Sequence, residues 1–93
     1  MPNYIARVEL HSASYQDYET LHAQMQQRGY ARTVLGNGGT TYQLPTGTYM
    51  VTDTNATLQQ AYDAAHAAAQ ATGKSSWTIV ADWTNARFNL AAT

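Results

Sequence analysis

Three side chains that could do acid-base chemistry alternate along the segment YIARVELH, residues 4–11. Arg7, Glu9 and His11 lie on one side of this segment if it is extended, because successive side chains of a strand point to opposite faces. A group that moves a proton, beside a cation that stabilises developing negative charge, is what phosphodiester cleavage needs. The same alternation is typical of the water-facing side of a sheet, with Ala6, Val8 and Leu10 inside.

The three histidines form no recognisable metal motif. His11, His22 and His66 lie at none of the short spacings of zinc sites, and the chain has no cysteine to complete such a set. The absence of cysteine also excludes disulfides and thiol nucleophiles. We therefore expect no metal and no cofactor.

The composition limits the partners. The chain has 93 residues, a net charge of -1 and only 12% charged residues, so it has no overall field that draws it to nucleic acid or to anionic membranes. Any contact with RNA must then be local. No segment approaches the roughly 18 apolar residues of a membrane span, and MPNYIARVEL lacks the pattern of a secretion signal. We expect one domain over residues 1–93, no membrane partner and a cytoplasmic location.

Two helices are predicted to position the candidate residues. Ser14 as N-cap and Gly29 as the left-handed residue at the end bound the first helix. Its inward stripe has helical spacing: Tyr18, Leu21, His22 and Met25. The second helix is opened by Asp53, Thr54 or Asn55 and closes near Gly73, and its inward stripe is mostly small: Leu58, Ala61, Tyr62, Ala65 and Ala69.

The remaining segments predict strands over 4–11, 31–35, 40–44, 48–52 and 76–82. GNGG at 36–39 favours a hairpin turn, since Asn and Gly accept positive φ. Pro45 and Gly47 divide the return arm of that hairpin into two pieces. WTNARFNL, residues 83–90, is either a short extra strand or an irregular tail.

The order strand, helix, strand, strand, helix, strand predicts an α+β fold. Right-handed crossovers arrange these elements as a ferredoxin-like β-α-β-β-α-β sandwich, with a four-stranded antiparallel sheet and both helices on one face.

Aromatic side chains offer two kinds of contact. Seven tyrosines and two tryptophans could stack on the bases of single-stranded RNA or anchor a protein interface. The tail ADWTNARFNL contains Trp83 and Phe88 and could add a strand to the sheet edge of another copy. Because a domain of this size has a small core, we expect a homodimer with Trp83 and Phe88 at its interface.

With this order of elements, the chain resembles the antitoxin endoribonucleases of the GhoS type, which cleave a toxin messenger RNA and share a fold with the CRISPR spacer-integration nucleases and VapD. The resemblance rests on YIARVEL, SYQDYETLHAQM, YQLPTGTYMVTD and the length. It places His22 where that family has an arginine proposed to act, and an imidazole moves protons but is no fixed cation at neutral pH. The CRISPR nucleases have a metal-binding aspartate near the end of the first strand, and this chain has only Glu9 near that position.

The leading expectation is therefore a small RNA-handling protein, a metal-independent endoribonuclease of a toxin-antitoxin or phage-defence system. Its proton carriers are expected among His22, His11 and Glu9. Its phosphate-binding residues are expected among Arg7, Arg28 and Arg32. The first alternative is a non-catalytic, protein-binding regulator with an aromatic surface, and the second is a small-ligand sensor that uses a groove between paired sheets.

Overall fold

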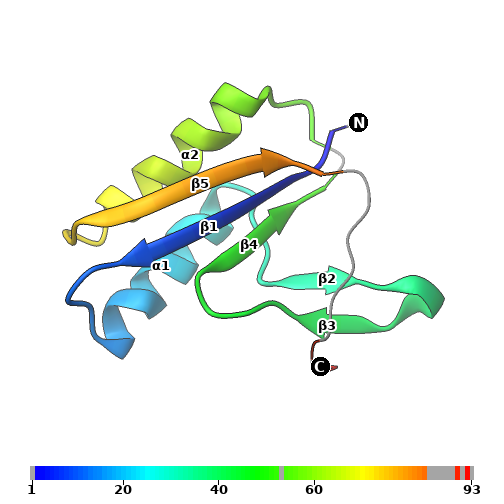
Figure 1. Ribbon diagram of the computed structural model, residues 1–93, viewed down its shortest axis with the longest axis horizontal. Helices are drawn as coiled ribbons and strands as arrows, with labels where there is room; N and C mark the ends of the chain where they lie inside the picture. The colour runs from blue at the N-terminus through cyan, green and yellow to red at the C-terminus, as the bar shows by residue number, and fades with distance from the viewer. Residues whose placement is uncertain (1, 53, 84–89, 91, 93) are drawn as a thin grey trace.

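A computed structural model describes residues 2–52, 54–83, 90 and 92. Within these residues the chain is α+β, with two helices, a three-stranded sheet and a two-stranded sheet (Figure 1). The elements in chain order are β1 (Tyr4–Leu10), α1 (Tyr15–Gln27), β2 (Thr33–Leu35), the 3-10 turn η1 (Asn37–Gly39), β3 (Thr41–Gln43), β4 (Thr48–Val51), α2 (Leu58–Gln70) and β5 (Ser76–Asp82). No helix among the described residues is long and apolar enough to cross a membrane.

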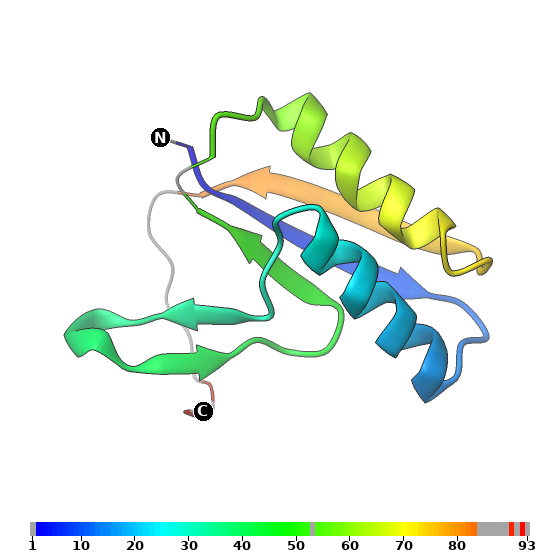
Figure 2. The same ribbon diagram turned by 180° about the vertical axis from the view of Figure 1, so that it is seen from behind.

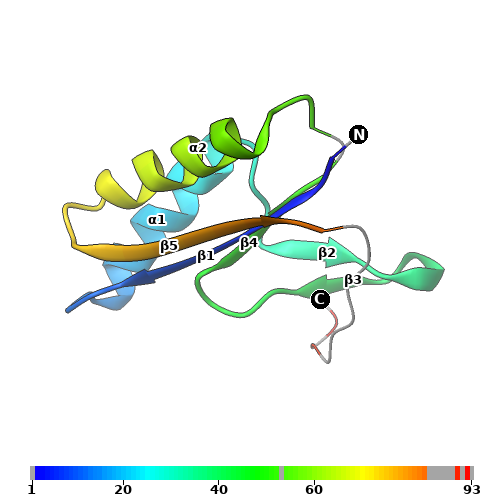
Figure 3. The same ribbon diagram turned by 45° about the horizontal axis from the view of Figure 1, so that its top comes forward.

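The three-stranded sheet has the order β4-β1-β5, and both outer strands run antiparallel to β1. The predicted alternation of β1 is confirmed, because Tyr4, Ala6, Val8 and Leu10 are buried while Arg7 and Glu9 are exposed. Both helices lie on the buried face of this sheet, next to each other (Figures 2 and 3). The main core therefore lies between β1 and the two helices.

The strand expected over 31–35 joins the sheet at one residue only. Ala31 exchanges two backbone hydrogen bonds with Met50 of β4, with N to O distances of 2.8 and 2.9 Å. β2 then diverges and pairs with β3 instead, because Val34 packs with Leu44 and Met50 in a second apolar cluster. The structure thus has a three-stranded and a two-stranded antiparallel sheet where one four-stranded sheet was expected.

The first helix begins as predicted. Ser14 accepts a hydrogen bond from the backbone N–H of Asp17, and the Asp17 carboxylate accepts one from the backbone N–H of Ser14, which completes a capping box. Gly29 follows the helix with φ of 90°, the left-handed conformation expected of it.

The predicted start of the second helix is wrong. Thr57 is its N-cap, not Thr54 or Asn55, and Asp53 lies outside the described residues. The reason is a second capping box, in which Thr57 and Gln60 satisfy each other's backbone N–H groups.

The buried stripe of α2 is made of alanine. Its buried residues are Ala61, Ala65, Ala68 and Ala69, whereas Leu58 at its first turn is exposed, contrary to the prediction. Small side chains let the helix lie close to β1 and β5. The large buried side chains of the core, Leu21, Met25 and Tyr49, come from α1 and β4 instead.

The predicted strand or tail over 83–90 falls mostly outside the described residues, and so does Phe88. Trp83 is half-buried and packs against the second apolar cluster with Leu90. Its backbone N–H donates to the carbonyl of Asn3 at 3.0 Å, which continues the ladder between β5 and the start of β1.

Candidate functional site

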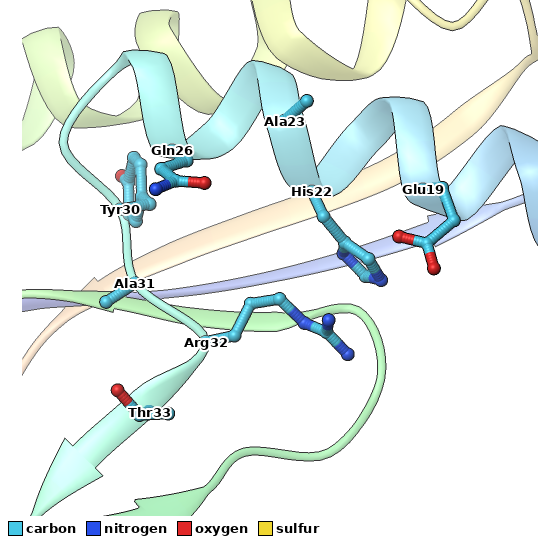
Figure 4. A pocket seen from close by; sticks show the side chains of 8 residues that line it. All are labelled: Glu19, His22, Ala23, Gln26, Tyr30, Ala31, Arg32 and Thr33. Atoms are coloured by element: carbon cyan, nitrogen blue, oxygen red, sulfur yellow. The ribbon is translucent and has the colours of Figure 1, made fainter.

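A pocket of about 480 Å³ lies between α1 and the segment that leads into β2 (Figure 4). The polar side chains that line it are Glu19, His22, Gln26, Arg32 and Thr33. Helical spacing places Glu19, His22 and Gln26 on one side of α1, and the Ala31–Met50 bridge holds the start of β2 opposite them. The pocket is therefore built where β2 leaves the sheet.

A buried tyrosine contacts His22 from the core side of the pocket. Leu21 and Met25 are fully buried on the same helix, which leaves His22 at the boundary between core and pocket. Its Nδ1 lies 2.6 Å from the hydroxyl of Tyr49 on β4, whose side chain is 0% exposed. Burial raises the pKa of Tyr49 far above its usual value, so the hydroxyl keeps its proton. The imidazole is thus held in one orientation.

The surroundings of His22 favour its neutral form. Desolvation lowers its pKa below the ordinary value of 6.5, and the positive charge of Arg32 lowers it further, while Glu19 acts in the opposite direction. A neutral imidazole has one ring nitrogen that accepts a proton. At neutral pH His22 is therefore in the form that can serve as a base.

Arg32 supplies the cation of the pocket. Its backbone carbonyl accepts hydrogen bonds from the Leu44 N–H at 2.8 Å and from the Gln43 side chain at 3.2 Å. These bonds fix the position of the Arg32 backbone. Figure 4 shows its side chain extending into the space beside His22 and Glu19. Within the described part of the chain its guanidinium makes no ion pair, so its N–H groups can bind an anion in the pocket.

The other sequence candidates lie elsewhere. His11 and Glu9 are at the far end of β1, where His11 Nε2 is 3.6 Å from the Glu9 carboxylate and the ring contacts Trp77 edge-on at 4.6 Å. Arg7 donates to the carbonyl of Thr46 at 2.9 Å. Arg28 closes the end of α1 by donating to Gln24. Of the six catalytic and RNA-binding candidates, the pocket brings together His22 and Arg32.

Two residues that shape the site, Glu19 in the pocket and Tyr49 in the core beside His22, were missed from the sequence. Glu19 lies three residues before His22, and this helical spacing is a signal that could have found it. Tyr49 gives no such signal, because its contact with His22 depends on the register that places β4 beside β1 and beneath α1.

Comparison of the chain with protein-family models, curated proteins and solved structures gave no match. Among the described residues, no three histidine, cysteine, aspartate or glutamate side chains form a group that could hold a metal ion. The ionisable groups of the pocket are therefore those of its own side chains: an imidazole, a guanidinium and a carboxylate.

Proposed function

We propose that the chain is a small RNA-handling protein and that the pocket between α1 and β2 cleaves single-stranded RNA as a metal-independent endoribonuclease. The observation that carries the proposal is the pairing of His22, a base with a lowered pKa, with Arg32, a guanidinium without an ion pair among the described residues. RNA contains its own nucleophile in the 2′-hydroxyl, so a base and a phosphate-binding cation are the groups that the protein must add.

The cleavage step assigns a role to each atom. The step requires the tautomer with a proton on Nδ1, in which His22 donates to the oxygen of the Tyr49 hydroxyl at 2.6 Å and Nε2 accepts the proton of the ribose 2′-hydroxyl. The 2′-oxygen bonds to phosphorus, and the bond from phosphorus to the 5′-oxygen breaks. The 5′-oxygen then takes a proton from the imidazolium, which leaves a 2′,3′-cyclic phosphate and a 5′-hydroxyl. Arg32 binds the phosphate oxygens as negative charge increases on them.

The fold is compatible with this proposal. Two helices on one face of an antiparallel sheet, in the order found here, support a ferredoxin-like arrangement in which the chain takes the fourth position only at Ala31, just before β2. This is the fold expected from the resemblance to the GhoS-type endoribonucleases. We extend the proposal to that family and to a toxin-antitoxin or phage-defence setting on the basis of the resemblance alone.

The test is cleavage of labelled single-stranded RNA, with chelator and without, by the wild-type chain and by His22→Ala. We expect cleavage that is insensitive to chelator and falls by about 100-fold or more in the variant, the usual effect of removing a general base. His66→Ala is the matched control, because His66 stacks on Tyr62 and does not line the pocket. RNA that remains intact with the wild-type chain, or equal losses in both variants, would contradict the proposal.

The role of Arg32 has its own comparison. We expect Arg32→Gln to slow cleavage by about 100-fold, and Arg28→Gln to leave the rate unchanged, because Gln24 holds the Arg28 guanidinium outside the pocket. Equal effects of the two substitutions would show that the pocket does not bind the phosphate.

One observation favours the alternative function, a protein-binding regulator without catalysis. Trp77 and Ile79 on β5 are 71% and 65% exposed, and side chains of this kind anchor protein interfaces. This alternative predicts a complex that persists in strong salt, since apolar contacts are not screened as ionic contacts are. RNA cleavage that requires His22, measured on the same preparation, would decide against it.

A further inference from the structure

The outer edge of β5 is unpaired among the described residues, since β5 has β1 as its one neighbour. The ladder to β1 includes bonds from the His11 N–H to the Ser75 carbonyl and from the Trp83 N–H to the Asn3 carbonyl. Odd-numbered residues of β5 therefore direct their backbone groups at β1, and even-numbered residues direct theirs away from the sheet. A seven-residue strand thus presents a row of free donors and acceptors.

The side chains along this edge also lack contacts: two are exposed and apolar, and one is a buried hydroxyl without a hydrogen bond to a described residue. Trp77 and Ile79, on the face away from the helices, are among the most exposed large apolar residues of the described chain. Thr78, between them, faces the helices, and its hydroxyl oxygen is buried without a hydrogen-bond partner among the described residues. A buried hydroxyl without a partner is unfavourable, so both faces of the strand indicate a missing neighbour.

We propose that β5 pairs antiparallel with β5 of a second copy of this chain, about a two-fold axis at Thr78. Each residue of one β5 then lies opposite the residue of the other β5 for which the two residue numbers add up to 156. Thr78 of one copy meets Thr78 of the other, and their hydroxyls can bond across the axis. Trp77 of each copy lies opposite Ile79 of the other, so the pair occurs once on each side of the axis. Pairs of an aromatic and a β-branched side chain stabilise sheets.

The charges near the ends of β5 support a second copy of this chain as the partner that pairs with its free edge. In this register Lys74, which lies in the bend two residues before β5, comes to the end of the paired strands where Asp82 of the other copy lies, so opposite charges meet at both ends. Lys74 already lies 3.7 Å from Asp17 of its own chain, and an ammonium group with three donors can serve both carboxylates. Lys74 before the strand and Asp82 at its end lie four residues on either side of Thr78, so the edge is complementary to itself, as a two-fold interface requires.

The proposed dimer has one six-stranded sheet, in the order β4-β1-β5-β5-β1-β4. It places the two pockets of the proposed function on separate copies, away from the interface. The inference is therefore independent of whether the pocket cleaves RNA, and it differs from the expected contact through Trp83 and Phe88, since Trp83 packs within its own chain.

Single cysteines test the register, since the chain has no cysteine of its own. Directly opposed residues have Cα atoms about 5.5 Å apart, within the range of a disulfide. We expect Thr78→Cys to give a covalent dimer of twice 10.2 kDa on mild oxidation. Val80→Cys is the matched control and should remain at monomer mass, because the two cysteines would lie about 14 Å apart along the strands. Equal cross-linking of the two variants, or none in either, would overturn the proposal.

A second measurement does not depend on oxidation. We expect Ile79→Lys to weaken dimerisation in sedimentation at least tenfold, while Leu35→Lys, at a residue that is 69% exposed on the β2–β3 hairpin, leaves it unchanged. Asp82→Lys should weaken it by about tenfold. A wild-type chain that stays monomeric at every concentration, or equal effects of Ile79→Lys and Leu35→Lys, would refute this pairing.

Discussion

Replacing Tyr49 with phenylalanine tests the link between the core and the pocket. The substitution keeps the ring, which is 0% exposed, and removes the hydroxyl that lies 2.6 Å from His22 Nδ1. One such hydrogen bond contributes about 1 kcal/mol net to stability. For 93 residues the unfolding entropy is about 0.2 kcal/mol per kelvin, so this loss corresponds to a melting temperature about 5 °C lower.

The assay is thermal and denaturant unfolding of Tyr49→Phe beside a matched control, Tyr62→Phe. The Tyr62 ring stacks on His66 at the surface of α2, and its hydroxyl has no hydrogen bond to a described residue. We expect the control to change the free energy of unfolding by less than about 0.5 kcal/mol. The difference between the two variants isolates the buried hydrogen bond from the general effect of removing a phenolic oxygen.

A double-mutant cycle decides whether the lost energy belongs to the contact with His22. If the contact is responsible, Tyr49→Phe should cost about 1 kcal/mol in the wild-type chain and close to nothing when His22 is already alanine. An equal loss in both backgrounds would refute the reasoning, because the hydroxyl would then act through other neighbours and the orientation of the imidazole would not depend on it.

The remaining predictions concern pH, backbone and capping. Because the pKa of His22 lies below 6.5 when folded, the unfolded state binds the proton first, so the free energy of unfolding should fall as pH drops below 6.5; denaturant titrations should show a flatter profile for His22→Gln. Gly47→Ala should destabilise more than Gly73→Ala in thermal unfolding, since both have positive φ but a Cβ at Gly47 would lie 2.5 Å from the Val8 carbonyl oxygen and one at Gly73 meets open space. Ser14→Ala should lose about 1 kcal/mol by denaturant unfolding, and an unchanged midpoint would contradict the capping box.

Local patterns predicted much of the fold correctly, because they reflect interactions between residues close in sequence. The structure contains the alternation over 4–10, one residue shorter than expected, the cap at Ser14, the glycine at Gly29 and the last strand at 76–82. The predicted start of α2 was wrong because several capping residues precede the helix, and of these Thr57 is the one that forms a capping box, with Gln60.

The sequence predicted which residues could form the candidate site, but not which of them lie together. The sequence offered three arginines and two histidines as equals, and nothing local distinguishes Arg32 from Arg28. Tertiary structure separates them, because Gln24 binds Arg28 at the end of α1 while the bridge at Ala31 turns Arg32 towards His22.

The sequence by itself determined the element types, the inward face of β1 and the alanine composition that lets α2 approach the sheet. These follow from periodicity and capping, whose interactions span a few residues. Only the tertiary structure decided that the chain leaves the sheet after Ala31 and that Tyr49 contacts His22. It also decided that, among the residues the structure describes, β5 lies at an edge and the Thr78 hydroxyl has no partner. Each of these depends on which distant segments share a register, and register is set by the packing of the whole chain.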